Sequence, residues 1–352
     1  MISIIGGGPS GAYLASLIKD KARIFEEHKE IGKPIQCSGI LTGSIKENIP
    51  LREDFIVNKI KKIELISPNN QRYEFKLNEE EIIVDRTKFD SFLIGKAEDN
   101  GAEILKGHKL KDFKINKEGI DLDFGTKEVK TDILVGADGV NSLVGRKIGL
   151  ENKKFKISHQ YRVRGEYDKE KYQVYFFNKG FGWIVPESEN VARIGVVSEE
   201  NVKDVFESFM GKIKIKKSDF IESQSGVIPM YDPKRKVNKG HVYLVGDAAG
   251  QVKATTHGGI VYGMRGAKVL AKVLNEGGNY NKLLKKEIGR GLRLHKKVEN
   301  YLNKFEDEDL DKFVSVLRKV KLGDFNRDRP FSKLGLFLKP SLIGFGLKRI
   351  LK

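Results

Sequence analysis

Three glycines near the start of the chain follow an apolar run at a spacing with chemical meaning. Gly6, Gly8 and Gly11 form the pattern G-x-G-x-x-G between an expected strand and an expected helix. In this setting the first glycine permits a tight turn, the second lets a pyrophosphate approach the backbone, and the third allows close helix packing. Glu26 ends the next expected strand, where a carboxylate can accept hydrogen bonds from a ribose diol. Together these residues predict a dinucleotide site.

A second glycine-rich stretch, far along the chain, indicates which dinucleotide is bound. Residues 243–250 (YLVGDAAG) resemble the second fingerprint of the glutathione-reductase-like flavoproteins, in which the aspartate holds the ribityl chain. Residues 137–139 (ADG) and 86–93 (RTKFDSFL) resemble two markers of the hydroxylase-like branch of that superfamily. An aspartate beside a glycine is also common in plain turns and helix caps. The family order of the markers nevertheless implies FAD.

Carried over residue by residue, the resemblance implies a set of FAD contacts. They are Gly6, Gly8, Ser10, Gly11, Glu26, Gln36, Cys37, Arg86, Asp138, Gly139, Asp247, Gly258, Gly259 and Ile260. No second G-x-G-x-x-G motif is present for a separate nicotinamide, so the electron donor stays open between NAD(P)H and reduced ferredoxin.

Within this superfamily the chain most resembles the geranylgeranyl reductases. Residues 33–39 (KPIQCSG) resemble their P-x-x-C-x-G loop over the flavin, and residues 181–186 (FGWIVP) resemble their Y-x-W-x-F-P strand. Residues 246–260 resemble G-D-A-A-G-Q-V-K-P-T-T-G-G-G-I, with Ala254 and His257 as departures. The resemblance implies reduction of double bonds in geranylgeranyl chains of glycerol-ether lipids or their precursors. The substrate contacts it implies are Phe181, Trp183 and Pro186.

Saturating an isolated alkene needs a proton as well as a hydride. Protonation of the less substituted carbon creates tertiary cation character, which then accepts hydride in a dry, apolar site. Cys37 is the leading candidate for donating that proton or orienting the alkene, because a thiol is mostly protonated at neutral pH. An inert cysteine packed on the flavin is the alternative. His257 could supply or relay a proton, but a capping histidine is the simpler interpretation.

The order of the expected elements indicates an α/β fold, α+β overall. We predict a Rossmann-type FAD-binding domain with an inserted antiparallel substrate sheet and a helical C-terminal region. The FAD-binding domain would take residues 1–60, 82–154 and 230–280; the substrate domain would take 61–81 and 155–229; the C-terminal region would take 281–352. Thr87 is expected to cap a helix that ends at Asn100-Gly101.

Composition bears on location and partners. Lys and Arg exceed Asp and Glu by 65 − 48 = 17, an excess that favours anionic partners or simply solvates the surface. The single cysteine rules out an internal disulfide and a cysteine-based zinc cluster, and we expect no metal. No signal peptide, membrane span or nucleic-acid motif is recognised. We therefore expect a cytoplasmic protein that does not bind nucleic acid.

The basic, apolar residues 331–352 favour an interfacial anchor on the inner face of the membrane, although a helix pair covering the lipid tunnel is equally compatible. Two other functions stay open. One is an FAD-dependent monooxygenase of the aromatic-hydroxylase type, and the other is a basic lipid- or nucleic-acid-binding protein with a vestigial flavin fold.

Overall fold

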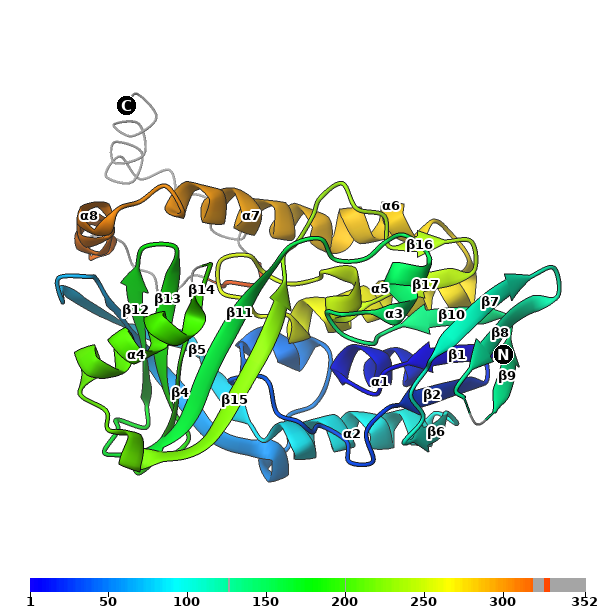
Figure 1. Ribbon diagram of the computed structural model, residues 1–352, viewed down its shortest axis with the longest axis horizontal. Coiled ribbons are helices and arrows are strands. Elements are labelled where there is room, and N and C mark those ends of the chain that lie inside the picture. The colour runs from blue at the N-terminus through cyan, green and yellow to red at the C-terminus, as the bar shows by residue number, and fades with distance from the viewer. Residues whose placement is uncertain (126, 200, 319–325, 330–352) are drawn as a thin grey trace.

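A parallel sheet lies at the N-terminal end of the fold. The computed structural model describes residues 1–125, 127–199, 201–318 and 326–329. Its first sheet has the strand order β16-β17-β10-β1-β2-β6 (Figure 1). The strands are β1 (Ile2–Ile5), β2 (Ala22–Glu26), β6 (Glu103–Lys106), β10 (Ile133–Gly136), β16 (Asn238–Lys239) and β17 (Val242–Leu244). All pair in parallel except β16 with β17. The central strands β1 and β10 are apolar and buried, because a parallel sheet is covered on both faces.

Helices and a small sheet accompany this parallel sheet. The helices are α1 (Pro9–Ala15), α2 (Arg86–Asp99), α3 (Leu143–Lys147) and α5 (Ile260–Glu276). The small antiparallel sheet consists of β7 (Asp112–Asn116), β8 (Gly119–Asp123) and β9 (Glu128–Thr131). The expectation for the cap of α2 was wrong: Asp85 caps it and accepts from the backbone N–H groups of Thr87 and Lys88. Because the carboxylate of Asp85 caps the helix, the helix begins at Arg86.

The second sheet has the order β15-β11-β14-β13-β12-β4-β5-β3. Its strands are β3 (Ile40–Leu41), β4 (Ile56–Ile66), β5 (Arg72–Val84), β11 (Phe155–Arg164), β12 (Lys171–Phe177), β13 (Gly180–Pro186), β14 (Val191–Ser198) and β15 (Phe220–Pro229). Its pairing is antiparallel, as expected, except that β12 and β4 run parallel. Strands β4 and β12 come from separate chain segments, so no hairpin constrains their direction.

Further helices cover the second sheet and join it to the first. They are α4 (Val202–Ile213), α6 (Tyr280–Leu284), α7 (Arg290–Leu302) and α8 (Asp307–Leu317), with a π-helix at Lys285–Gly289. Phe206, Phe209 and Met210 of α4 pack in the core of the second sheet. Figure 1 shows α7 running along the molecule from α6, beside the first sheet, to α8, beside the second. Among the described residues, no helix is long and apolar enough to cross a bilayer. The predicted fold class is confirmed.

Candidate cofactor and substrate site

A single cavity of about 1170 Å³ joins the two sheets. On one side it is lined by the loops that follow β1, β2, β10 and β17 of the first sheet. Crevices outside the carboxyl ends of parallel strands are where open α/β sheets bind ligands. On the other side it is lined by β4, β5, β12 and β13 of the second sheet, and by α7 and α8. The cavity thus reaches elements that are far apart in the sequence.

The glycine turn after β1 is shaped by close backbone contacts. Gly6 has φ +105°, and a Cβ there would lie 2.3 Å from the carbonyl oxygen of Ala137. A Cβ on Gly11 would lie 2.2 Å from the Gly6 carbonyl oxygen. Gly8 faces open space, with no atom within 4 Å of its Cβ position. Gly6, Gly8 and Ser10 line the cavity, whereas Gly11 is buried outside its wall, where it permits helix packing.

Glu26 lies at the carboxyl end of β2, as predicted, and it lines the cavity. Its Oε2 accepts from the Gly7 backbone N–H at 2.8 Å, which ties β2 to the glycine turn. Its Oε1 accepts from the His28 backbone N–H at 2.9 Å and lies 2.7 Å from His28 Nδ1. Carboxylate oxygens accept two bonds each, so the group keeps capacity for a ribose. The sequence interpretation missed His28.

Cys37 and Gln36 lie in the cavity wall near the start of α2. The Gly39 backbone N–H donates to Cys37 Sγ at 3.3 Å. Arg86 makes two hydrogen bonds to Asp90, at 2.9 and 2.8 Å. Burial acts to lower the pKa of Arg86, but Asp90, and to a smaller extent Cys37, raise it above its ordinary value. A guanidinium therefore lies beside the thiol and stays charged.

The two predicted aspartates behave differently. Both oxygens of Asp138 hold the first turn of α3: Oδ1 accepts from Ser142 Oγ at 2.6 Å and Oδ2 from the Val144 N–H at 3.1 Å. This is the helix-cap role that a plain Asp-Gly turn would give. Gly139, with φ +73°, lines the cavity beside it.

Asp247 points its carboxylate into the cavity. No described residue donates a hydrogen bond to that carboxylate; the Asp247 backbone carbonyl accepts from Asn152 Nδ2 and from the Gly250 N–H. Desolvation by the surrounding protein raises the pKa of Asp247, and Arg86 opposes the rise. A Cβ on Gly259 would lie 2.9 Å from Asp247 Oδ1, so the approach of α5 requires glycine there. Gly259 and Ile260 line the cavity, whereas Gly258 does not.

His257 lines the cavity and has a left-handed backbone, with φ +54°. Its ring stacks on Phe181, with centroids 5.5 Å apart and planes inclined by 10°. Burial lowers its pKa to about 3, and Lys156 and Lys296 act in the same direction. The ring is therefore neutral near pH 7, which argues against an imidazolium proton donor. Its Nδ1 is buried without a hydrogen-bond partner, as is Thr256 Oγ1.

The second-sheet end of the cavity is an apolar chamber. Its wall carries aliphatic and aromatic side chains: Ile63, Leu65, Phe75, Leu77, Tyr172, Val174, Phe176, Phe181, Trp183, Leu294, Val298, Leu302, Phe313 and Leu317. Phe181 and Trp183 thus lie where the sequence places them. Pro186 lies outside the wall, and its carbonyl accepts from Asn58 Nδ2 at 2.9 Å. The other chamber residues were missed, although the spacing of Tyr172, Val174 and Phe176 at every second position was a readable signal.

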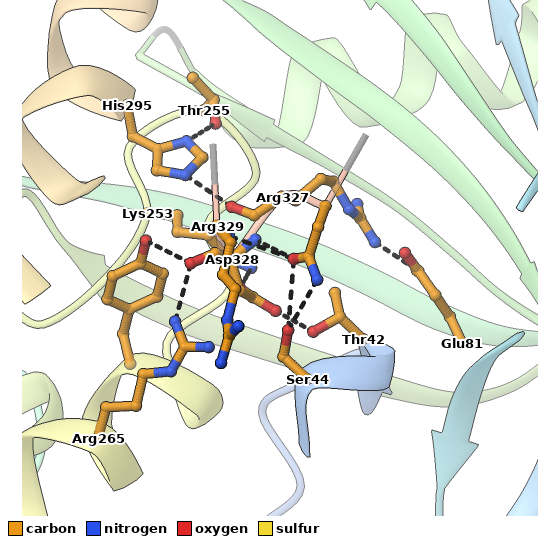
Figure 2. Close-up of polar contacts among 12 residues, drawn as sticks. Thr42, Ser44, Glu81, Lys253, Thr255, Arg265, His295, Arg327, Asp328 and Arg329 are labelled. Carbon is orange, nitrogen blue, oxygen red and sulfur yellow. Dashed lines mark hydrogen bonds and ion pairs between the residues drawn. The ribbon is translucent and has the colours of Figure 1, made fainter. Parts of the chain in front are cut away.

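A buried polar network lies near α5, and some of its residues line the cavity (Figure 2). Residues 326–329 lie in its centre, where Asp328 forms an ion pair with Lys253 of the turn before α5 and accepts from Thr42 Oγ1. Arg327 forms an ion pair with Glu81 of β5 and lines the cavity. His295 of α7 bridges the two parts, with Nδ1 2.6 Å from Thr255 Oγ1 and Nε2 2.8 Å from the Arg327 carbonyl oxygen. The segment thus fastens the first sheet, the second sheet and α7 together.

Comparison with known proteins identifies the family over more than half of the chain, across strands of both sheets. Residues 1–204 match the family described as FAD binding domain. The chain belongs to this family. The cavity fits that cofactor: Gly8 leaves room for a pyrophosphate, and Asp247, Thr256 and His257 offer polar atoms that no described residue satisfies.

Relatives of this FAD-family protein by sequence span nearly its full length. An uncharacterized protein of Methanocaldococcus jannaschii is 29% identical over 99% of this chain and 97% of its own. A digeranylgeranylglycerophospholipid reductase of Methanosarcina acetivorans is 27% identical over 91% of this chain and 89% of its own. The predicted resemblance to geranylgeranyl reductase-like proteins is thereby confirmed.

Solved structures agree on the fold. A geranylgeranyl bacteriochlorophyll reductase-like protein from Thermoplasma acidophilum superposes with a TM-score of 0.88 at 22% identity, over 97% of both chains. The halogenase PltM superposes with a TM-score of 0.73 at 14% identity, over 99% of this chain and 85% of its own. At these identities the likeness concerns the fold alone. The same two-sheet fold thus occurs in a protein called reductase-like and in one called a halogenase.

Proposed function

We propose that the protein is an FAD-dependent reductase that saturates double bonds of geranylgeranyl chains on isoprenoid glycerol-ether lipids or their precursors. The observation that carries the proposal is the continuity of one cavity, from a dinucleotide cradle to a long apolar chamber. The digeranylgeranylglycerophospholipid reductases among the relatives support this substrate class. An apolar chain in the chamber would lie against side chains that exclude water.

The chain's own residues would have three tasks. When bound and reduced, FAD supplies the hydride. The chamber wall would hold one alkene near the thiol loop and keep water away, because water would compete for the developing cation. Cys37 Sγ would give its proton to the less substituted carbon, and the other carbon would receive the hydride. The resulting thiolate would lie beside the Arg86 guanidinium and the Gly39 N–H, and would regain its proton from solvent.

Two partners belong to the proposal. An external donor, either NAD(P)H or reduced ferredoxin, must return two electrons to the cofactor after each turnover. The lipid substrate implies contact with the membrane surface from the cytoplasmic side. The basic, apolar residues 331–352 on which that contact rests lie outside the described residues.

The test is direct saturation of a lipid by the purified protein. The protein, loaded with FAD and reduced with dithionite, is incubated with digeranylgeranylglycerophospholipid in detergent. Mass spectrometry should show the gain of one H₂ for each bond reduced. A colourless product that cannot be reconstituted with FAD, or a lipid of unchanged mass, would refute the proposal. Oxygen consumption with NAD(P)H and a phenol would instead favour the monooxygenase alternative.

A matched pair of variants links the activity to the cradle. Gly8→Asp adds a carboxylate where nothing lies within 4 Å of the Cβ position, so it should fold yet repel a pyrophosphate. Gly211→Asp makes the same change at an exposed helix position that is equally open and lies outside the cavity wall. Loss of FAD in the first variant alone is the expected result.

A further inference from the structure

Four residues form a row across the second sheet, beside the chamber. Trp183 of β13 is in register with Gly195 of β14, Gly195 with Gln160 of β11, and Gln160 with Gln224 of β15. A Cβ on Gly195 would lie 2.5 Å from Trp183 Cζ2 and 2.5 Å from Gln160 Cβ. The glycine therefore leaves the space through which the indole reaches the first amide.

Hydrogen bonds along this row fix the orientation of both amides. Trp183 Nε1 donates to Gln160 Oε1 at 3.2 Å, and Gln160 Nε2 donates to Gln224 Oε1 at 2.6 Å. An indole N–H can only donate, so it requires the oxygen of Gln160 to face it. The nitrogen of Gln160 must then face Gln224, and it requires an oxygen there. The tryptophan thus determines which way both glutamine amides are oriented.

We call the hydrogen-bonded chain from Trp183 through Gln160 to Gln224 the relay. Its last member, Gln224, has a donor group without an acceptor. Gln224 is 4% exposed, and its Nε2 is buried without a hydrogen-bond partner. Leaving such a donor unsatisfied costs free energy, and buried amides normally find partners. Gln160, Gln224 and Trp183 all line the cavity. An acceptor supplied by a molecule in that cavity would satisfy the orphan group.

The loop that carries Cys37 packs beside the end of this relay. Gly226 lies two residues from Gln224 and therefore on the same face of β15. A Cβ on Gly226 would lie 2.7 Å from the carbonyl oxygen of Gln36. Gln36 and Cys37 line the same cavity as Gln224. The orphan donor is thus close to the loop at which the proposed reaction takes place.

We propose that Gln224 is a ligand-binding residue that donates a hydrogen bond from Nε2 to an oxygen acceptor of the molecule in the cavity. The inference rests on the proposed function for the identity of that molecule. Two sources carry such an oxygen: the carbonyl edge of the flavin ring, and the polar end of the lipid. Gln160 and Trp183 act as positioning residues, because they hold the Gln224 amide with its nitrogen free.

The test uses Gln224→Met, which keeps the length of the side chain but removes both the donor and the oxygen that accepts from Gln160 Nε2. Trp183 is the only tryptophan of the chain and lies in the cavity wall, so its fluorescence reports ligand entry. One arm titrates the flavin-free protein with FAD, and the other titrates it with the lipid in detergent. Gln173→Met is the matched control, since Gln173 lies in the same sheet but outside the cavity wall and donates to Glu64.

Loss of one neutral hydrogen bond should weaken one titration about three- to tenfold. Weaker FAD binding assigns the acceptor to the flavin, and weaker lipid binding assigns it to the lipid. Unchanged affinity in both arms overturns the proposal while leaving the reductase activity standing. If the wild-type protein binds no FAD, the reductase proposal fails, and the lipid titration alone tests whether Gln224 donates to the ligand. Gln224→Ala replaces the methionine variant if that variant does not fold.

Discussion

At the scale of single residues, the proposed reaction depends on Cys37. Its sulfur accepts a hydrogen bond from the Gly39 backbone N–H and interacts with the charged Arg86 guanidinium, and both groups would stabilise the thiolate left after the proposed proton transfer. An inert packing cysteine would need neither neighbour. The surroundings therefore favour a chemical role, and the role is testable without disturbing the fold.

We predict that Cys37→Ala binds FAD normally but reduces the alkene about 100-fold more slowly, the usual contribution of a general acid. The measurement is a single turnover with prereduced flavin and saturating lipid, which isolates the chemical step. Cys37→Ser, which keeps a small hydroxyl, serves as comparison and should recover part of the rate. Full activity in the alanine variant would remove Cys37 from the mechanism.

His257 illustrates how a local conformation explains a departure from a family pattern. The archaeal pattern identified in the sequence has glycine at this position, and the backbone here has φ +54°, where glycine is unstrained. The histidine compensates by stacking on Phe181. Its depressed pKa follows from the same burial, so it makes stability depend on pH.

We predict that His257→Asn makes the protein less sensitive to mild acid. Asparagine tolerates a left-handed backbone and does not titrate. Between about pH 6.5 and the folded pKa of about 3, the unfolded histidine binds a proton that the folded one does not, so acid destabilises wild type. At about pH 5 this amounts to roughly 2 kcal/mol. Urea denaturation at about pH 7.5 and about pH 5 should show that extra loss in wild type only; equal losses would contradict it.

At the scale of elements, the network around residues 326–329 holds the turn before α5. The buried carboxylate of Asp328 neutralises Lys253, and Lys253 keeps the pKa of Asp328 low against the effect of burial. Lys253 belongs to the segment whose end, at Gly259 and Ile260, lines the cofactor side of the cavity. The position of that turn thus depends on a segment that lies about seventy residues later.

We predict that Asp328→Asn lowers the free energy of unfolding by about 3–5 kcal/mol, because Lys253 would remain buried without a counter-charge. Asp54→Asn is the control: that carboxylate pairs with Arg52 at the surface, where both side chains are 56% exposed, and its loss should cost less than about 1 kcal/mol. Urea denaturation compares the two. Similar small losses would mean that the buried pair does not hold the turn.

Much of the structure around the first sheet could be predicted from short sequence motifs. The glycine turn, Glu26 and the Asp247 loop each join a short apolar strand to a turn, and parallel strands bring their carboxyl ends together. The relay of Gln160 and Gln224 had no such signal, because it depends on the register of strands that are about sixty residues apart. The same holds for Asp328, whose partners Thr42, Lys253, Tyr262 and Arg265 lie far from it in the sequence. Long-range pairing rather than local propensity decided these sites.

At the scale of the whole molecule, the two sheets divide the work. The first sheet supplies the cradle with glycines and polar groups, and the second supplies a wall of large apolar side chains. Gly259 in the wall and Gly195 beside the wall residue Trp183 show how closely each side is packed, since neither position has room for a Cβ. Cofactor affinity and chain-length preference should therefore be separable by mutation.

Val174→Trp in β12 tests this separation. Val174 lies between Tyr172 and Phe176 on the strand face that lines the chamber, so an indole there would occupy space proposed for the isoprenoid. FAD affinity should stay at the wild-type value, because the cradle lies on the first sheet. Geranylgeranyl substrates should lose most of their activity, whereas a short prenyl analogue should retain its activity.

Competition between the two substrates in one reaction measures the change in kcat/KM directly. Val57→Trp is the control, because Val57 is 39% exposed on β4 of the same sheet and lies outside the cavity wall. A parallel loss for both chain lengths would mean that the chamber does not hold the isoprenoid, since a blocked tunnel must discriminate by length. Loss of FAD in the Val174 variant would mean that the two sheets are not independent.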